Sequence, residues 1–323
     1  MISPWKRARH RLEYAVVRLL AWGIPKLSRR AAVRAGKALG ALAYRLDARG
    51  RAVSLANLEA VFGDKFGPAE RERIARASYQ TFARTMLDLF WAQRLTPENW
   101  TKYLRLENAE RFADDVRSGR GALFAFTHLG NFEWTHLAIG FAGFGGYGVQ
   151  EDFKNPLLTE IFTRLRGHSG HTVVAQERSM LRFFKHLKRG GTAGPLIDLT
   201  LSPSQPSAII DALGLKMCVT YMHAELSRRT GLPIYPLEAI PADDGTCRVI
   251  VHDPVAFPAE TPPQVITQAC WNVFEPIIRA RPEHWMWAYK HFRYKPAGAT
   301  RPYPFYANES KKFEKLRRET PGG

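Results

Sequence analysis

The chain has 323 residues, of which 45% are hydrophobic and 12% aromatic, and this apolar content excludes a disordered protein. Its 47 Lys and Arg residues exceed its 30 Asp and Glu residues, and the net charge of +17 predicts an anionic partner. Candidates are nucleic acid, an anionic membrane, an acidic carrier protein or a phosphorylated lipid. Because no nucleic-acid-binding module accompanies the charge, we expect no nucleic acid among the partners.

The first 100 residues have helical spacing and form the first predicted segment. A helix is expected to begin at Pro68, and near the N-terminus apolar residues recur at helical spacing, from Leu12 and Val16 to Ile24. Arg18 interrupts that apolar stretch, which argues against a cleaved signal and against a firm transmembrane span. Two interpretations stay open: an interfacial helix that anchors the protein to a membrane, or an amphipathic helix packed on its own core.

Between residues 101 and 300, short apolar runs alternate with helical segments. Strands are predicted at 121–126, 192–198, 232–240 and 247–255, and helices at about 132–140, 156–166, 179–188, 219–230 and 262–280. This alternation predicts an α/β core in which a mixed, mainly parallel sheet is flanked by helices, within a single functional domain overall. Residues 301–323 read as a basic tail, which we expect to be frayed.

The residues that carry chemistry follow the first of these strands. The strand runs directly into His128, a turn follows at Gly130 and Asn131, and a helix opens with Glu133 in its first turn. If the turn doubles back, Glu133 can fix the tautomer of His128 and support its charged form. His128 would then act as a general base on a hydroxyl that attacks an acyl carbonyl. The alternative is that the two residues only end a strand and cap a helix.

The stretch HLGNFE at residues 128–133 resembles the H-x4-D/E motif of the lysophospholipid acyltransferase superfamily. In the context of the preceding strand, it is most similar to the late acyltransferases of bacterial lipid A biosynthesis. Segments 51–64, 151–170, 181–198 and 282–296 also resemble that family, in the same order. The resemblance implies a glycerol-3-phosphate acyltransferase-like fold and no cofactor.

The implied reaction is O-acyl transfer from acyl carrier protein, or from coenzyme A, to a hydroxyl of a lipid A precursor or related glycolipid. The enzyme would serve lipopolysaccharide synthesis at the cytoplasmic face of the bacterial inner membrane, where both the carrier and the membrane surface are anionic. The resemblance makes His128 and Glu133 the catalytic pair. It further implies substrate-binding roles for Asn131, for Arg166 with Arg164 as the next candidate, and for Asp198.

One region departs from the family pattern and leaves the acceptor open. Residues 197–217 read IDLTLSPSQPSAIIDALGLKM where the family has a P-D-Q or P-D-H sequence and an aromatic patch. The acceptor could therefore be a phospholipid, an ornithine-type lipid or a mannosylated inositol lipid instead. A different class is a basic protein that binds membrane or nucleic acid and in which the motif is accidental.

Other conspicuous side chains have structural interpretations. Trp285, Trp287 and Tyr289 are expected in the core, and Cys218, Cys247 and Cys270 are expected to be buried thiols in a reducing compartment. His168 and His171 lack a third ligand at suitable spacing, so we expect no metal.

Overall fold

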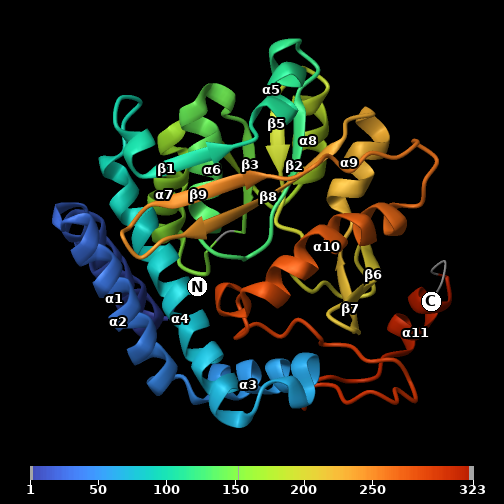
Figure 1. Cartoon of the computed structure of the whole chain (residues 1–323). Coiled ribbons are helices and arrows are strands. Elements are labelled where there is room, and N and C mark those ends of the chain that lie inside the picture. Colours follow the sequence, from blue (N-terminus) through green and yellow to red (C-terminus); the bar gives the residue numbers. More distant parts are fainter. Residues whose placement is uncertain (1–2, 152, 320–323) are drawn as a thin grey trace.

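The computed structural model describes residues 3–151 and 153–319 and begins with a helical third (Figure 1). The long helices of this part are α1 (Pro4–Gly23), α2 (Arg29–Leu46), α3 (Ala48–Phe62) and α4 (Pro68–Trp91). The predicted N-terminal helical segment is confirmed, as is the helix that begins at Pro68.

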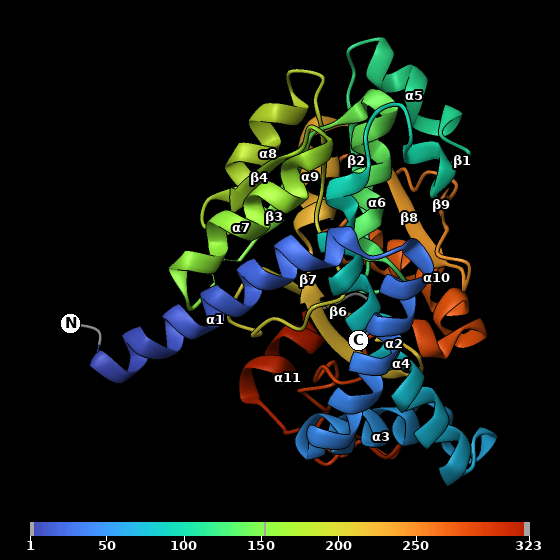
Figure 2. The ribbon, with the colours of Figure 1, turned by 90° about the vertical axis from the view of Figure 1, so that its left-hand side faces the viewer.

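Helix α1 lies across one side of the molecule (Figure 2). It has two apolar faces. Val17 and Leu20 pack against the core, whereas Leu12 is 67% exposed and Leu19 63% exposed. The inward face confirms packing on the protein's own core, and the outward face leaves an apolar row in solvent. Within residues 3–151 and 153–319, no helix is both long and apolar enough to cross a membrane.

Two glycines bring α2 against α4. A Cβ atom at Gly36 would lie 2.7 Å from the Cα of Arg84, and one at Gly40 would lie 2.4 Å from the Cα of Gln80. Since these distances are too short for any side chain, glycine at both positions lets the two helix backbones touch. Helix α2 is thereby held along α4.

A seven-stranded sheet forms the centre of the rest of the chain, in the order β1-β9-β8-β2-β5-β3-β4. Its strands are β1 (Leu104–Glu107), β2 (Ala122–Ala125), β3 (Tyr147–Gln150), β4 (Thr172–Ala175), β5 (Thr192–Gly194), β8 (Ile234–Pro241) and β9 (Cys247–Val251). Strands β8 and β9 are antiparallel, and every other neighbouring pair is parallel. The prediction of a mixed, mainly parallel sheet is confirmed.

Helices flank this sheet and follow its strands along the chain (Figure 1). They are α5 (Glu110–Arg117), α6 (Phe132–Ile139), α7 (Pro156–Arg166), α8 (Ser179–Leu187), α9 (Met222–Thr230) and α10 (Pro263–Ala280). The α/β class with an N-terminal helical segment is therefore confirmed. Cys218, Cys247 and Cys270 are free and buried, as expected.

Several strands of the structure were not predicted from the sequence, and one predicted helix begins later than expected. Strands β1, β3 and β4 have only four residues each and show little hydrophobic patterning, so they were not predicted. The region that departs from the family pattern contains an antiparallel hairpin of β6 (Ser207–Ala212) and β7 (Leu215–Thr220). Because β7 continues to Thr220, the helix expected from 219 begins only at Met222.

The expectation of a frayed C-terminal tail is wrong for residues 311–318, which form helix α11 (Lys311–Arg318). The hydroxyl of Ser310 caps this helix by accepting a hydrogen bond from the backbone N–H of Phe313 at 3.4 Å. Phe313 itself is fully buried and anchors the helix. Residues 320–323 of the predicted tail lie outside the described residues.

The imidazole of His223 in α9 makes the fold sensitive to acid. Its side chain is fully buried, and its two ring nitrogens have no hydrogen-bond partner among the described residues. Burial lowers its pKa from 6.5 to about 3. A histidine that stays neutral in the folded state contributes stability above pH 6.5, and this contribution is lost as the pH falls toward the lowered pKa.

We therefore expect the free energy of unfolding, measured by urea denaturation, to fall between pH 6.5 and pH 5 by roughly 2 kcal/mol from His223 alone. His223→Leu should reduce the pH dependence by about that amount because the variant has no proton to take up at this position. Equal pH dependence of the variant and the wild type would contradict this assignment.

Candidate active site

The site lies where two neighbouring parallel strands end. Strands β2 and β5 pair in parallel, and the pairing continues beyond them as a bridge between Phe126 and Leu196. Carboxyl ends of parallel strands share one edge of the sheet, which is where α/β proteins usually place their ligands. His128 follows β2 and Asp198 follows β5, so the two residues meet although 70 positions separate them.

The side chain of His128 is held by Asp198. The Nδ1 atom of His128 lies 2.8 Å from Oδ1 of Asp198, and the backbone N–H of His128 donates to Oδ2 at 2.9 Å. The indole N–H of Trp285 donates to the same Oδ2 atom at 2.9 Å. Asp198 and Trp285 are fully buried, whereas the side chain of His128 is 12% exposed. The carboxylate is thus fixed in the interior and the imidazole reaches the surface.

This arrangement determines which nitrogen of His128 can act as a base. Burial alone would raise the pKa of Asp198, but the charge of His128 and the hydrogen bonds from His128 and Trp285 lower it to about 2. Asp198 is therefore a carboxylate at neutral pH, and it accepts a hydrogen bond from the protonated Nδ1 of His128. In the part of the chain that the structure describes, Nε2 of His128 has no hydrogen-bond partner, so its lone pair is available for a substrate proton.

Glu133 does not contact His128 in the way the sequence suggested. Its carboxylate accepts hydrogen bonds from Arg166 instead, with Nη2 2.5 Å from Oε1 and Nε 3.0 Å from Oε2. Arg166 also donates to Oε1 of Gln150, at the end of β3. Burial would raise the pKa of Glu133, but Arg166, with smaller contributions from His136 and His128, keeps it below its ordinary value. The hydrogen-bonded partner of His128 is therefore Asp198 and not Glu133, as was expected. The reason is that α6 places Glu133 next to Arg166 of α7.

The turn between His128 and Glu133 is fixed by α4 and β8. Gly130 has φ +59°, and a Cβ atom there would lie 1.8 Å from the carbonyl oxygen of Ala239, so only glycine fits. Asn131 is the N-cap of α6, accepting from the backbone N–H of Trp134 at 3.2 Å, and its amide donates to Asp88 at 2.8 Å. Both ends of the buried Asn131 side chain therefore have protein partners, and its expected role in substrate binding stays a prediction.

Asp88 of α4, which holds Asn131, also forms a buried ion pair with Arg29 of α2. The Nη2 atom of Arg29 lies 2.8 Å from Oδ2 of Asp88. The guanidinium of Arg29 also lies over the ring of Trp134, with 4.5 Å between Cζ and the ring centroid. These contacts tie the helical N-terminal segment to the loop that carries His128.

The two arginines expected to bind substrate lie apart. Residues two positions apart in a helix point in directions that differ by about 200°. Arg166 accordingly faces Glu133, whereas Arg164 lines a separate pocket between α7 and α1.

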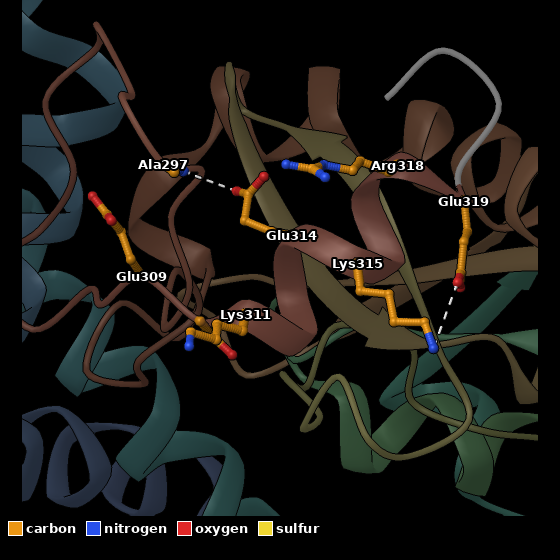
Figure 3. A pocket seen from close by; sticks show the side chains of 8 residues that line it. Ala297, Glu309, Lys311, Glu314, Lys315, Arg318 and Glu319 are labelled. Atoms are coloured by element: carbon orange, nitrogen blue, oxygen red, sulfur yellow. Dashed lines mark hydrogen bonds and ion pairs between the residues drawn. The ribbon is translucent and has the colours of Figure 1, made fainter.

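A larger pocket of about 630 Å³ lies beside α11 and is lined by charged side chains of both signs (Figure 3). Its lining includes Lys315, which pairs with Glu319, and Glu314, which accepts from the backbone N–H of Ala297. No residue of the His128 site contributes to it. Among the residues that the structure describes, no cluster of three or more His, Cys, Asp or Glu side chains could hold a metal ion.

The chain matches known proteins over nearly its whole length. The family model of the bacterial lipid A biosynthesis acyltransferases matches residues 5–294. The chain belongs to this family. It is also similar to the lipid A biosynthesis lauroyltransferase of Escherichia coli (strain K12), with 24% identity over 290 residues, covering 86% of this chain and 90% of the relative. The protein is thus an acyltransferase.

Three further residues contribute to the candidate site, namely Trp285, Gln150 and Phe132. Trp285 and Trp287 are fully buried, as predicted for core residues, but Trp285 also orients Asp198. Gln150 holds Arg166, and the ring of Phe132 lies 4.8 Å from that of His128. Gln150 carries no local signal in the sequence, because it ends β3, a strand too short to show periodicity.

The pairing of Glu133 with Arg166 can be tested by a double-mutant cycle. Glu133→Gln should lower the free energy of unfolding by about 3 kcal/mol because it leaves a half-buried guanidinium without its carboxylate. Arg166→Gln should have a similar effect, and in the double variant the second substitution should add little, giving a coupling energy of about 1–3 kcal/mol in urea denaturation. As a control, Arg182→Gln at an exposed position of α8 should change stability by less than about 0.5 kcal/mol. Additive effects of the two substitutions would rule the pairing out.

Proposed function

We propose that this acyltransferase moves a fatty acyl chain from the thioester of acyl carrier protein, or of coenzyme A, to a hydroxyl of a lipid A precursor or related glycolipid. The observation that carries the proposal is the hydrogen bond from Nδ1 of His128 to the buried Asp198, which leaves Nε2 free at the surface. The family match and the name of the E. coli relative support the lipid A precursor as acceptor.

In the proposed mechanism, Nε2 of His128 takes the proton of the acceptor hydroxyl as its oxygen attacks the thioester carbonyl. Asp198 stabilises the imidazolium that forms, since it is already charged and makes no new contact. The tetrahedral adduct then expels the thiolate, which recovers the proton from Nε2. The products are an ester and a free thiol, and no nucleophile of the protein is consumed.

Glu133 and Arg166 form the second half of the proposed site. Because Glu133 holds Arg166 on two nitrogens and Gln150 holds a third, the guanidinium has a fixed position. We assign Glu133 the task of positioning Arg166, and Arg166 the task of binding the substrate through the 27% of its side chain that is exposed.

The catalytic assignment predicts distinct effects for two substitutions. His128→Ala should abolish acyl transfer. Asp198→Asn should lower kcat by about 10²–10⁴-fold, because an amide does not favour the required tautomer of the imidazole. The KM of Asp198→Asn should change little, since Asp198 is buried away from substrate. Both can be measured with a carrier thioester and a lipid A precursor, following products by mass.

His252→Gln is a matched control, because His252 also pairs with a carboxylate, Glu238, and its substitution should leave the rate unchanged. Wild-type turnover by His128→Ala would remove the general base from the mechanism. Transfer to a phospholipid but not to the lipid A precursor would redirect the proposal to another acceptor.

We further propose that residues 1–100 attach the enzyme to the cytoplasmic face of the inner membrane. Helices α1 and α2 lie on the same side of the molecule (Figure 2). The outward row of α1 contains Leu12, Val16 and Leu19, and exposed leucines also line α2, where Leu42 is 50% and Leu46 75% exposed. Exposed apolar rows of this kind suit insertion into the lipid interface.

Basic residues accompany both rows. Those exposed on α1 and α2 are Lys6, Arg7, Arg9, Arg11, Arg18, Arg30, Arg34 and Arg45. Each Lys or Arg near an anionic bilayer contributes about 1 kcal/mol to attraction. The charge of these helices therefore favours an anionic membrane over a neutral apolar partner.

Leu12→Glu with Leu19→Glu should weaken binding to anionic vesicles by at least about tenfold, since each leucine loses the free energy of its burial in the interface. Sedimentation with vesicles measures the effect. Phe305→Glu is the control, because Phe305 is equally exposed, at 69%, but lies in the C-terminal segment. A loss of binding as large in Phe305→Glu would contradict docking through α1.

A further inference from the structure

A second pocket, of about 300 Å³, lies between α1, α7 and the turn that follows α4. Most of its lining is polar or charged: Tyr14, Arg18, Trp22, Gln93, Glu160 and Arg164. Its volume is at the lower end of the range for small-molecule sites. The size and lining suit a charged head group and not an acyl chain.

The walls of this pocket are fixed by hydrogen bonds. The amide of Asn155, the N-cap of α7, donates to the carbonyl of His10 at 2.8 Å and to Glu13 at 2.9 Å, which ties α1 to α7. The amide of Gln93 donates to the carbonyls of Ala21 and Phe90. The pocket therefore exists before any ligand binds.

Its charged groups are available to a ligand. The side chain of Arg164 makes no hydrogen bond or ion pair with any described residue, and neither does the side chain of Glu160, one turn before it in α7. Among those residues, the guanidinium of Arg18 contacts Tyr14, with 3.5 Å between Nη1 and the hydroxyl oxygen and 5.7 Å between Cζ and the ring centroid, and no carboxylate neutralises its charge. Two guanidinium groups and one carboxylate thus face one small space.

The pocket also lies beside the apolar row of α1. Arg18 and Trp22 line it from the same helix that carries Leu19, and Trp22 is 64% exposed. The ammonium of Lys26 lies 3.2 Å from the ring centroid of Trp22. Aromatic and basic residues at such positions are typical of the level of lipid head groups.

We propose that this pocket binds a phospholipid head group that carries both a phosphate and a primary ammonium, as in phosphoethanolamine. Arg18 and Arg164 take the phosphate, since guanidinium groups form strong hydrogen bonds to phosphate oxygens. Glu160 takes the ammonium, which accounts for a carboxylate in an otherwise basic pocket. The inference rests on the proposed docking of α1 on the membrane and is independent of the acyl-transfer chemistry.

The test measures binding of the full chain to vesicles of phosphatidylcholine and a constant share of phosphatidylglycerol, with and without phosphatidylethanolamine in place of part of the phosphatidylcholine. The wild type should bind more tightly when phosphatidylethanolamine is present, because the quaternary ammonium of phosphatidylcholine cannot donate hydrogen bonds to Glu160. Arg18→Gln and Arg164→Gln should each weaken this binding tens of fold. Arg11→Gln, an exposed arginine of α1 outside the pocket, should weaken it only about fivefold through general electrostatics. Glu160→Gln should remove the preference for phosphatidylethanolamine.

Soluble competitors separate the sources of the phosphate. Glycerophosphoethanolamine should displace the protein from these vesicles, whereas inorganic phosphate at equal ionic strength should not. Equal effects of Arg164→Gln and Arg11→Gln would overturn the site, as would equal binding with and without phosphatidylethanolamine, or displacement by inorganic phosphate alone. If the wild type binds no vesicles at all, the docking of α1 fails, and the pocket proposal fails with it. Loss of acyl transfer in His128→Ala tests only the chemistry.

Discussion

The site depends on one constraint, which is that the carboxyl ends of β2 and β5 lie side by side. Their parallel pairing brings Asp198 under His128, and the buried carboxylate accepts hydrogen bonds from the ring and the backbone of that residue and from Trp285. Each of these donors stabilises the ionised carboxylate against its burial. The imidazole is consequently held in one orientation by the sheet itself and not by the loop that carries it.

The two carboxylates of the site are divided between two cationic partners. Asp198 lies against His128, and Glu133 lies against Arg166, and in both cases the nearby positive charge keeps a buried acid ionised. The spacing between His128 and Glu133 serves this division, because the intervening turn sends the first side chain toward β5 and the second toward α7. In this chain, Glu133 of the motif thereby fixes the guanidinium of Arg166.

Much of this could be predicted from local sequence. The buried strand before His128, the cap at Asn131 and the helix that follows all have short-range signals, and the structure contains each of them. The partner of His128 could not be predicted in the same way, because the pairing of β2 with β5 depends on strand order, which the sequence does not state. The short strands β1, β3 and β4 could not be predicted either, since four residues show too little hydrophobic periodicity. Helix α11 could not be predicted because its sequence is mostly charged and Phe313 is its one fully buried residue.

The glycine contacts between α2 and α4 have a mechanical consequence. Helix α2 cannot slide or tilt on α4 without collision, and α4 is in turn joined to the turn before α6 through Asp88 and Asn131. With α2 seated on a bilayer as proposed, the reactive nitrogen would be held at a set height above the lipid surface. A substrate hydroxyl at that height would be within reach, and one buried deeper or held farther out would not. Selection among hydroxyls would then follow from distance to the membrane as well as from the shape of the site.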